Sequence, residues 1–405
     1  MKSQVLPVLF VTLLIDMIGF GMVIPVLPVL FNDPASPSFL LKQWSEGSQL
    51  FMAGFVLALF GLVQFIASPI LGELSDVYGR KNVLLTGVVM LAVSQLLFGF
   101  AVTIGSLALV IIARALGGIA GANFSVAQAI IADVTTPENR AKSFGIIGAA
   151  FGIGFITGPL IGGWFTSAVG TPSAPFVLAG MLGLLNAIGI TFALPETHTE
   201  KRSVVKKITF LRGVHNVRYA LDDVQARPLF LSNFFVQLGF SSFTTFIGVL
   251  LLTRYSYSEA DIGMFFAAIG LWIVITQAGI LPRVMSVLTE KKVIPVALAV
   301  LPVALALHAI FLPIFWMYCL MPLVAISVGL SNACMLSLMS RNVGPDKQGI
   351  TLGINASVQA LALGFGPLAG GLSAAVLGIY APFLFAALCV AMGGFVFSRS
   401  ARKMA

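Results

Sequence analysis

The sequence predicts an all-α membrane protein with twelve transmembrane helices arranged as two pseudo-symmetric six-helix bundles. Composition is the first reason: hydrophobic residues make up 58% of the 405-residue chain and charged residues only 9%, whereas about a quarter of a soluble domain is charged. The second reason is a series of long apolar segments, and the third is an internal repeat that relates the two halves. The sequence does not show the short alternating segments of a membrane β-barrel.

Each of the twelve apolar segments is long enough to cross a bilayer core of about 30 Å at a rise of about 1.5 Å per residue. The first segment is too long for a cleavable signal core and has no small-residue cleavage site before the next segment, so we expect it to be retained. The three cysteines fall within later segments, and we interpret them as small core residues. The segments lie near residues 5–31, 48–71, 82–102, 106–132, 143–168, 174–194, 228–253, 260–282, 293–312, 314–339, 350–377 and 380–398.

Basic residues in the loops predict the orientation of the chain. If the N-terminus is cytoplasmic, nearly all loop lysines and arginines face the cytoplasm, and only Lys42 and Arg254 lie outside. We therefore expect a multi-pass protein of the lipid bilayer with both termini in the cytoplasm. This topology explains the net charge of +8. No nucleic-acid partner is expected, because the charge is spread over loops and is not gathered on one domain.

A long polar stretch, rich in lysine and arginine, joins the sixth and seventh segments. It predicts an N-terminal six-helix bundle over residues 1–194, a cytoplasmic linker over 195–227 and a C-terminal six-helix bundle over 228–405. Two parallel six-helix halves with a site between them are what a rocking transporter needs. The halves repeat each other at an offset of 208 residues, as in Pro137-Glu138 with Pro345-Asp346, Gly158-Pro159-Leu160 with Gly366-Pro367-Leu368, and Gly162-Gly163 with Gly370-Gly371.

Asp16 is a lone acidic side chain near the middle of the first apolar segment. A carboxylate at that depth costs several kcal/mol unless it faces a wet cavity or a partner, so we interpret Asp16 as a proton carrier that water reaches from alternating sides. Arg114, in the fourth segment, is the other charge without a solvated explanation. Counting from the segment ends puts both side chains about 12–13 Å below the outer boundary. They form either a structural ion pair or a titrating site in which hydration and distance alter the proton affinity of Asp16.

Four stretches carry the patterns of a known family. They are Asp16-Met-Ile-Gly-Phe-Gly-Met-Val-Ile-Pro25-Val-Leu-Pro28, Gly72-Glu-Leu-Ser-Asp76-Val-Tyr-Gly79-Arg80-Lys81, Arg114-Ala-Leu-Gly117-Gly118-Ile-Ala-Gly121, and Gly148 through Gly163. In this order and on these segments they resemble the major facilitator superfamily, specifically its proton-coupled drug antiporters of the tetracycline-efflux type. The resemblance covers the whole length. It implies the major facilitator fold, a bacterial inner (cytoplasmic) membrane location, and a central cavity lined by segments 1, 2, 4, 5, 7, 8, 10 and 11.

The loop between segments two and three carries both signs of charge beside two glycines, so the chain can turn tightly there while Asp76 and Arg80 pair or cap helix ends. The resemblance implies a gate latch that must break as the halves rock. An ordinary positive loop with incidental acids is the alternative. The family often has a basic residue at the position of Val77, so any charge relay in this loop would have one member fewer than usual. The expected latch residues are Gly72, Asp76, Gly79, Arg80 and Asp133.

Segment five is rich in glycines spaced four apart, which make smooth faces for close helix packing. Pro159 adds a kink and frees a carbonyl group. Together with Gly158 it suits a helix that bends or seals against its partner during gating, whereas plain small-residue packing is the alternative. The glycines are Gly148, Gly152, Gly154, Gly158, Gly162 and Gly163.

Amide side chains on the expected central segments define a candidate substrate cavity that is polar-dotted but largely apolar. Any single amide is alternatively an interhelical hydrogen bond, which is common in membrane proteins. The candidate substrate-binding residues are Gln64, Asn123, Asn233, Gln237, Gln277, Asn332, Asn355 and Gln359.

These observations predict a proton-driven secondary antiporter that exports a hydrophobic or amphipathic small molecule by alternating access. Asp16 would carry the proton, Arg114 would tune it, and the amides would orient the substrate. We expect a monomer with a small-molecule substrate and protons as its partners, and without a cofactor or metal. Tetracycline-type exporters also use acids on helices three and nine and a histidine on helix eight. Those are missing from this sequence, which argues against tetracycline as the substrate.

Other functions fit less well. An exporter of a lipid, siderophore or sugar conjugate and a proton symporter of the same fold remain alternatives, and a channel is formally open. An enzyme would need a nucleophile–base set or a metal cluster, which His198, His215 and His308 do not supply. The sequence has no phosphate-cradling loop, so ATP is not expected to drive transport.

Overall fold

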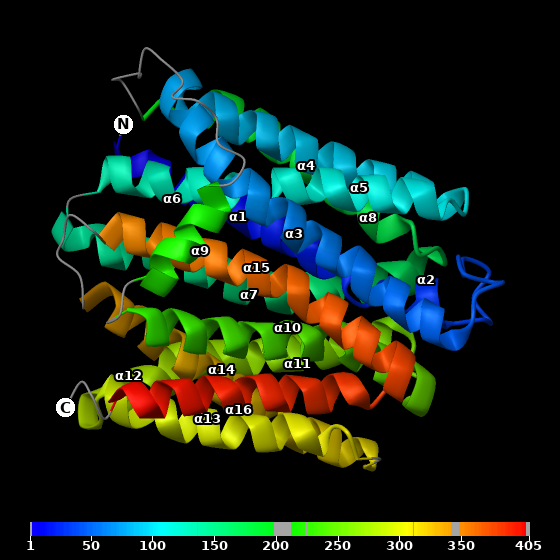
Figure 1. The fold of residues 1–405 in the computed structure, drawn as a ribbon. Coiled ribbons are helices and arrows are strands. Elements are labelled where there is room, and N and C mark those ends of the chain that lie inside the picture. Colours follow the sequence, from blue (N-terminus) through cyan, green and yellow to red (C-terminus); the bar gives the residue numbers. More distant parts are fainter. Residues whose placement is uncertain are drawn as a thin grey trace.

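The computed structural model describes residues 2–135, 137–197, 212–222, 226–310, 312–341 and 348–401. Within these residues every regular element is helical, and the long helices run side by side along one direction of the molecule (Figure 1). Helix α1 begins and helix α16 ends at the same face (Figure 1), which we call the terminal face; the opposite one is the far face. The predicted all-α class is confirmed.

The N-terminal half contains two interrupted segments. Helix α2 follows α1 after a turn at residues 24–26, and α5 and α6 are separated by a break at Gly121 and Ala122. The helices are α1 (Lys2–Val23), α2 (Leu27–Asn32), α3 (Glu46–Tyr78), α4 (Arg80–Thr103), α5 (Leu107–Ala120), α6 (Asn123–Val134), α7 (Pro137–Val169) and α8 (Ala174–Ala193).

The C-terminal half completes the expected set of segments. Eleven stretches of the described chain are long and apolar enough to cross a membrane. Helix α13, whose first turn carries Glu290, Lys291 and Lys292, adds the twelfth, so the predicted number is confirmed. The helices are α10 (Arg227–Tyr255), α11 (Glu259–Ile275), α12 (Leu281–Val287), α13 (Glu290–Leu307), α14 (Ile314–Arg341), α15 (Gln348–Leu377) and α16 (Ala381–Ala401), with a π-helical turn, Thr276–Ile280, between α11 and α12.

Helix ends follow local capping chemistry. At the start of α11 the Ser258 hydroxyl accepts a hydrogen bond from the backbone N–H of Asp261, and the Asp261 carboxylate accepts one from the backbone N–H of Ser258. This capping box satisfies two N–H groups that the helix leaves unpaired. Between α3 and α4, Gly79 has a φ of +96°, a conformation that favours glycine. The chain can therefore reverse there without a loop.

Each half buries its own hydrophobic core. Two clusters of buried side chains consist entirely of residues between Val5 and Leu194. The largest cluster lies almost wholly between Ala220 and Phe397, and it also includes Leu50 and Phe155 from the N-terminal half. The exact domain boundaries at 194 and 228 stay a prediction, because residues 198–211 and 223–225 of the expected linker lie outside the described residues.

Contacts between the halves are made mainly by α3 with α15 and by α7 with α11. Glycine occupies the closest approaches. A Cβ atom on Gly61 would lie 2.6 Å from the backbone nitrogen of Gly364, and one on Gly47 would lie 2.8 Å from the carbonyl oxygen of Ala375. These contacts lie in the parts of the helices that are nearer the far face, and we call them the far-face seal. Its glycines are Gly47, Gly54, Gly61, Gly163, Gly263, Gly364 and Gly371.

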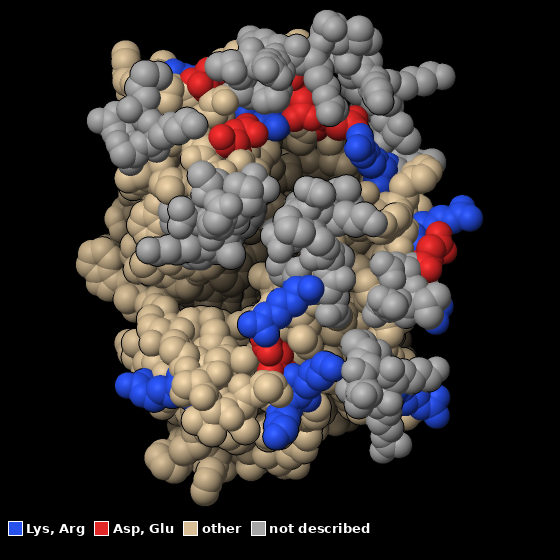
Figure 2. Space-filling model, turned by 90° about the vertical axis from the view of Figure 1, so that its left-hand side faces the viewer, with Lys and Arg blue, Asp and Glu red and all other residues tan. Residues whose placement is uncertain are grey.

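The terminal face is hollowed between the two halves. Figure 2 views this face and shows a recess whose walls are mostly uncharged, with lysine, arginine and acidic side chains gathered around it. The molecule is therefore closed at the far face and open at the terminal face.

A short linker helix, α9 (Arg212–Asp222), touches both halves at the terminal face. Arg212 forms an ion pair with Glu73 of α3. Asn216 donates a hydrogen bond of 3.1 Å to the hydroxyl of Ser357 on α15. The described part of the linker is thus attached to one helix of each half.

The far-face seal predicts the effect of a single methyl group. In Gly54→Ala the new Cβ would overlap the carbonyl oxygen of Pro367, and such overpacking costs about 1–3 kcal/mol. We expect α3 and α15 to separate. Spin labels at Trp44 and Leu377, in a variant without the three native cysteines, should report a larger population of long distances.

Gly189→Ala is the matched control, because a Cβ at Gly189 has no neighbour within 4 Å. A distance distribution in Gly54→Ala that equals that of the control would contradict the seal.

Candidate functional site

Asp16 lies inside the N-terminal half and is 8% exposed. On α1 it shares a face with Leu9 and Leu13, which are buried against residues of α4, α6 and α8. Val11, on the opposite face, is 48% exposed. Access of water from alternating sides, which the sequence predicts for Asp16, would be simplest if this carboxyl group faced the hollow between the two halves. The structure instead places it within the core of one half, because α1 turns its buried face toward its own bundle.

Polar side chains surround Asp16 on its own side of α1. Asn123, the first residue of α6, interacts with the carboxyl group. One turn along α1 toward the terminal face, the Thr12 hydroxyl donates to the amide oxygen of Asn186 at 3.2 Å. One turn toward the far face, Gln95 donates to the carbonyl oxygen of Gly19 at 3.0 Å. The carboxyl group therefore belongs to a buried polar layer of the N-terminal half.

Arg114 is buried on α5 and does not meet Asp16. Its Nε donates a long hydrogen bond of 3.4 Å to the carbonyl oxygen of Val56, and its guanidinium lies 5.0 Å from the ring centre of Phe60. Among the described residues, its Nη2 has no hydrogen-bond partner and no carboxylate pairs with it.

The two charges differ in depth along the fourth segment. Asn123, which is next to Asp16, follows Arg114 by nine residues, or about 13 Å of helix. Counting from the segment ends gave Asp16 and Arg114 the same depth in the membrane, because the count assumes straight helices with known membrane boundaries. The actual chain has a turn after Val23 and a break at Gly121.

The expected latch residues do come together at the terminal face. Arg80 is buried at the start of α4 and pairs with Asp76 of α3 at 2.6 Å and with Asp133 of α6 at 3.0 Å. Its guanidinium also donates to the Ser75 hydroxyl at 2.5 Å and to the carbonyl oxygen of Gly72 at 3.5 Å. One arginine therefore ties three helices together. We call Asp76, Arg80 and Asp133 the N-terminal latch.

Glu196 is a further member of this corner that sequence reasoning missed. Its carboxylate accepts a hydrogen bond of 2.9 Å from the backbone N–H of Arg80. A Cβ atom on Gly79 would overlap the same carboxylate. An acidic residue directly after α8, at the face where basic residues gather, was the signal that could have identified it.

The C-terminal half has an equivalent corner with the charges reversed. Glu290, at the start of α13, pairs with Arg341 at the end of α14 at 3.1 Å and accepts a hydrogen bond of 2.9 Å from Ser337. Arg341 stands 208 residues after Asp133, which is the offset of the repeat. Here the helix that begins at the corner carries the acid, whereas in the N-terminal latch it carries the base. We call Glu290 and Arg341 the C-terminal clamp.

Most of the predicted substrate-binding amides form interhelical hydrogen bonds. Asn233 on α10 donates to Asn355 on α15 at 2.8 Å, and Asn332 on α14 donates to Gln237 on α10 at 3.4 Å. The alternative interpretation, that these amides hold helices together, therefore describes the bonds they make in this conformation.

Two further amides bond to backbone at helix irregularities. Gln64 donates to the carbonyl oxygen of Gly121 at the break between α5 and α6, at 2.9 Å. Gln277, on the π-helical turn, donates to the carbonyl oxygen of Gly329 at 3.3 Å. Among the described residues only Gln359 and Asn123 of the eight candidates make no hydrogen bond, and Gln359 is partly exposed.

Helix α7 packs between the two halves through its small residues. Gly158 is in close contact with the backbone of α1 at Ile18 and Gly21, while the carbonyl oxygen of Pro159 meets Gly263 of α11. The predicted gating pair thus lies where α7 contacts one helix of its own half and one helix of the other.

Comparison with known proteins identifies the family. A model described as Major Facilitator Superfamily matches residues 9–367. The chain belongs to the major facilitator superfamily. It is therefore a multi-pass membrane transporter and not an enzyme.

The transporter is similar to tetracycline, multidrug and quinolone resistance proteins over nearly their whole length. It is 30% identical to the tetracycline resistance protein, class C, of Escherichia coli, with 91% of this chain and 89% of the relative covered. It is 27% identical to multidrug resistance protein 2 of Bacillus subtilis, with coverage of 97% and 94%. It is 28% identical to the quinolone resistance protein NorA of Staphylococcus aureus, with coverage of 92% and 90%.

Solved structures show the same fold. The human organic anion transporter MFSD10 (TETRAN) matches with a TM-score of 0.73 and 24% identity, covering 98% of this chain and 99% of that one. A bacterial homologue of the human lysosomal transporter Spinster, in an inward-facing and unoccupied conformation, matches with a TM-score of 0.77 and 14% identity, covering 99% and 97%.

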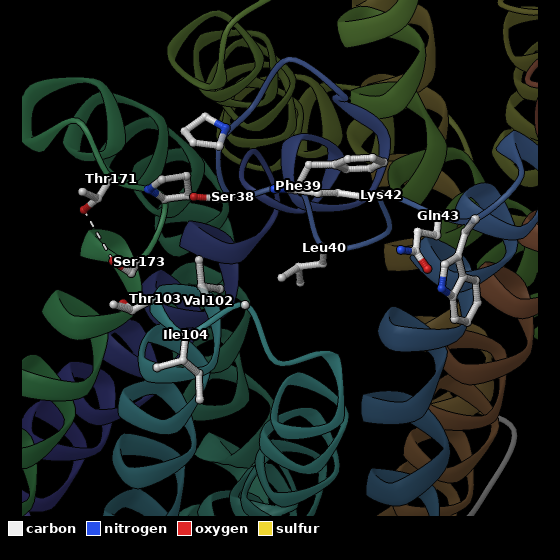
Figure 3. Close-up of a pocket in the computed structure, with 14 residues that line it drawn as sticks. Ser38, Phe39, Leu40, Lys42, Gln43, Val102, Thr103, Ile104, Thr171 and Ser173 are labelled. Carbon is white, nitrogen blue, oxygen red and sulfur yellow. Dashed lines mark hydrogen bonds between the residues drawn. The ribbon is translucent and has the colours of Figure 1, made fainter.

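The transporter also has a pocket of about 650 Å³ at the far face, shown in Figure 3. Its walls come from the loop between α2 and α3, from the end of α4 and from the turn before α8, and Lys42 is its one charged residue. None of the predicted site residues lines this pocket. It lies within the N-terminal half and is separate from the hollow between the halves.

The N-terminal latch predicts a coupled pair of substitutions. Because Arg80 is buried between two partly exposed carboxylates, removing one partner leaves its charge only partly compensated, at a cost below the roughly 3–5 kcal/mol of breaking a fully buried pair. Arg80→Gln and Asp133→Asn should each lower the thermal midpoint of the purified transporter in detergent. The double variant should lose less than the sum of the single losses.

Arg218→Gln is the control for general charge removal, because Arg218 faces Asp222 at 3.8 Å with its side chain 81% exposed, and exposed pairs contribute little. Strictly additive losses in the double variant would show that Arg80 and Asp133 do not act as a pair.

The C-terminal clamp predicts rescue by charge exchange. Glu290→Arg places two cations together and should reduce the yield of folded transporter, whereas Glu290→Arg with Arg341→Glu restores an ion pair with the polarity of the N-terminal latch. We expect the double variant to recover at least half of the loss in thermal midpoint. Size-exclusion profiles and thermal unfolding check this, and a double variant as unstable as Glu290→Arg would refute the clamp.

Proposed function

We propose that this transporter is a proton-driven antiporter that exports a hydrophobic or amphipathic small molecule by alternating access. The observation that carries the proposal is a carboxyl group, Asp16, buried midway along a membrane-spanning helix and without a basic partner among the described residues. Keeping a charge there is expensive, so such a group is retained for function and not for stability. Taking up and releasing a proton is the chemistry available to it.

Drug-efflux relatives support export as the direction. Relatives that match over about nine-tenths of their length or more are named for resistance to tetracycline, to quinolones or to multiple drugs. The mostly uncharged walls of the hollow suit an amphipathic or hydrophobic substrate (Figure 2). Gln237, Asn332 and Gln359 are partly exposed, and we assign them the task of orienting it.

We assign the terminal face to the cytoplasm of a bacterial inner membrane and the working unit to a single chain. Loop basic residues concentrate at the terminal face, and Lys42 and Arg254 lie toward the far face, as the positive-inside rule requires. In this orientation the conformation is open to the cytoplasm and closed to the outside by the far-face seal. The Spinster homologue with a similar fold is described as inward-facing.

The position of Asp16 changes how the proton and the substrate are coupled. Direct displacement of the proton by the substrate requires both in one cavity, but Asp16 faces the core of the N-terminal half. We therefore propose that coupling passes through the packing of α1 against its neighbours. Arg114 acts only at a distance, because among the described residues it forms no ion pair with a carboxylate.

Proton coupling predicts a specific loss in Asp16→Asn. In proteoliposomes with a trapped pH indicator, the wild-type protein should release protons when tetracycline, a fluoroquinolone or ethidium is added, at least for one of the three. Asp16→Asn should abolish the release while it keeps the wild-type elution profile and substrate binding. Asp33→Asn, in the loop after α2, is the control and should behave like the wild type.

Normal substrate-driven proton release by Asp16→Asn would remove Asp16 from the mechanism. Transport of a substrate by the wild type without any proton release would remove antiport itself.

A further inference from the structure

Asn123 is a buried amide to which the proposed transport mechanism assigns no role. It is 2% exposed, and among the described residues neither its oxygen nor its nitrogen has a hydrogen-bond partner. Buried polar groups are nearly always paired, so an orphaned amide in a membrane helix calls for an explanation. Sequence analysis placed Asn123 with the substrate-binding amides, but its side chain lies inside the N-terminal half.

The amide lies between two helices. On one side is Asp16 of α1, with whose carboxyl group it interacts. On the other side is Gly87 of α4, where an added Cβ would overlap the amide oxygen. The amide therefore has room next to the carboxyl group only because residue 87 is glycine.

Asn123 also stands at a break in its own segment. Gln64 of α3 donates to the carbonyl oxygen of Gly121 at 2.9 Å, and the hydroxyl of Ser125 donates to the carbonyl oxygen of Ser68, also on α3, at 2.9 Å. The break is thus held against α3, while the 12 residues of α6 after it form a separate helix.

The other end of α6 belongs to the N-terminal latch. Asp133 is ten residues after Asn123, or about 15 Å along α6, and it pairs with Arg80 at 3.0 Å. A single short helix therefore has the neighbour of the proton carrier at one end and a latch residue at the other.

We propose that Asn123 is a positioning residue that responds to the protonation state of Asp16 and transmits it, through α6, to the latch. The inference rests on the proposed function, in which Asp16 carries the proton. An amide suits this role because its NH₂ group can donate to a carboxylate, whereas its oxygen can accept from a carboxylic acid. In this conformation the two groups interact without a partner at hydrogen-bond distance for the amide, and we infer that tightening this contact draws α6 toward α1 about the break.

The charges around Asp16 leave the amide as its principal polar contact. The described part of α1, all of α8 and residues 147–169 of α7, which packs along α1, contribute no other ionisable side chain at this level. On the fourth segment the charges are Arg114 and Asp133, about 13 Å and 15 Å from Asn123 along the helix. On α4 they are Arg80 and Lys81, at its end on the terminal face.

The experiment measures how the opening at the terminal face depends on pH. Spin labels at Tyr78 and Val287, which are 57% and 81% exposed at the terminal ends of α3 and α12, report the distance between the halves in the full-length, cysteine-free protein in nanodiscs. We expect the wild type to shift between open and closed populations along a pH series. Asn123→Leu should move the midpoint by about 1–2 pH units, the size of one hydrogen bond to a charged group.

Two further variants separate this role from a merely structural one. Gly87→Ala removes no polar group but displaces the amide, and it should move the midpoint as Asn123→Leu does. Asn186→Leu is the matched control, because Asn186 is also a buried asparagine beside α1 but bonds to Thr12. It should keep the wild-type midpoint.

A midpoint in Asn123→Leu equal to that of the wild type would overturn the inference, and so would equal shifts in Asn123→Leu and Asn186→Leu. The proposed function fails separately: if Asp16→Asn keeps the full pH dependence of the distance, Asp16 is not the proton carrier. Loss of the pH dependence in Asp16→Asn with an unchanged Asn123→Leu refutes the role of Asn123 alone.

Discussion

The cost of a polar group in hydrocarbon is the constraint on which the rest of this structure depends. A lipid-facing segment has no water to satisfy a stray amide or charge, so each such group must find a partner inside the bundle. Gln64, Asn233 and Gln277 find one on a neighbouring helix. Asp16 and Asn123 stand out because they have little beside each other to satisfy them, and we propose that they respond to protonation for that reason.

The two terminal-face corners show how one architecture is built twice from different residues. In each, an ion pair joins the start of one membrane-spanning segment to the end of the following segment. In the first half Arg80 is at the helix start and Asp133 at the helix end, whereas in the second half Glu290 and Arg341 have the opposite charges. The two halves therefore keep the same position for the ion pair, whereas the acid and the base exchange places between them. Helix α9, which contacts Glu73 and Ser357, joins the halves near these corners.

The features that sequence alone predicted are those set by the length of apolar segments and by the signs of the charges. The twelve segments follow from apolar runs, and the grouping of Arg80 with Asp76 and Asp133 follows from the signature loop. The direction of Asp16 could not be predicted in the same way, because the first segment is apolar on all sides and gives no polar face to orient. Its separation from Arg114 depends on a helix break at Gly121 that hydropathy does not show. The pair of Glu290 and Arg341 could not be found by matching like residues at the offset of 208, because Arg341 stands opposite an acid, Asp133.

The glycine-lined contact between the halves has an energetic consequence. Backbone approaches backbone at several of these glycines, and among the described residues no ion pair joins the two surfaces, so separating them exposes only a few large side chains, notably Leu50 and Phe155. Small residues on both surfaces keep the apolar area that opening exposes low. A low cost of opening is what a carrier needs if it is to be driven by one elementary charge crossing 100 mV, which releases roughly 2.3 kcal/mol. A carrier built in this way can be driven by single ions descending an ordinary membrane potential, without nucleotide hydrolysis.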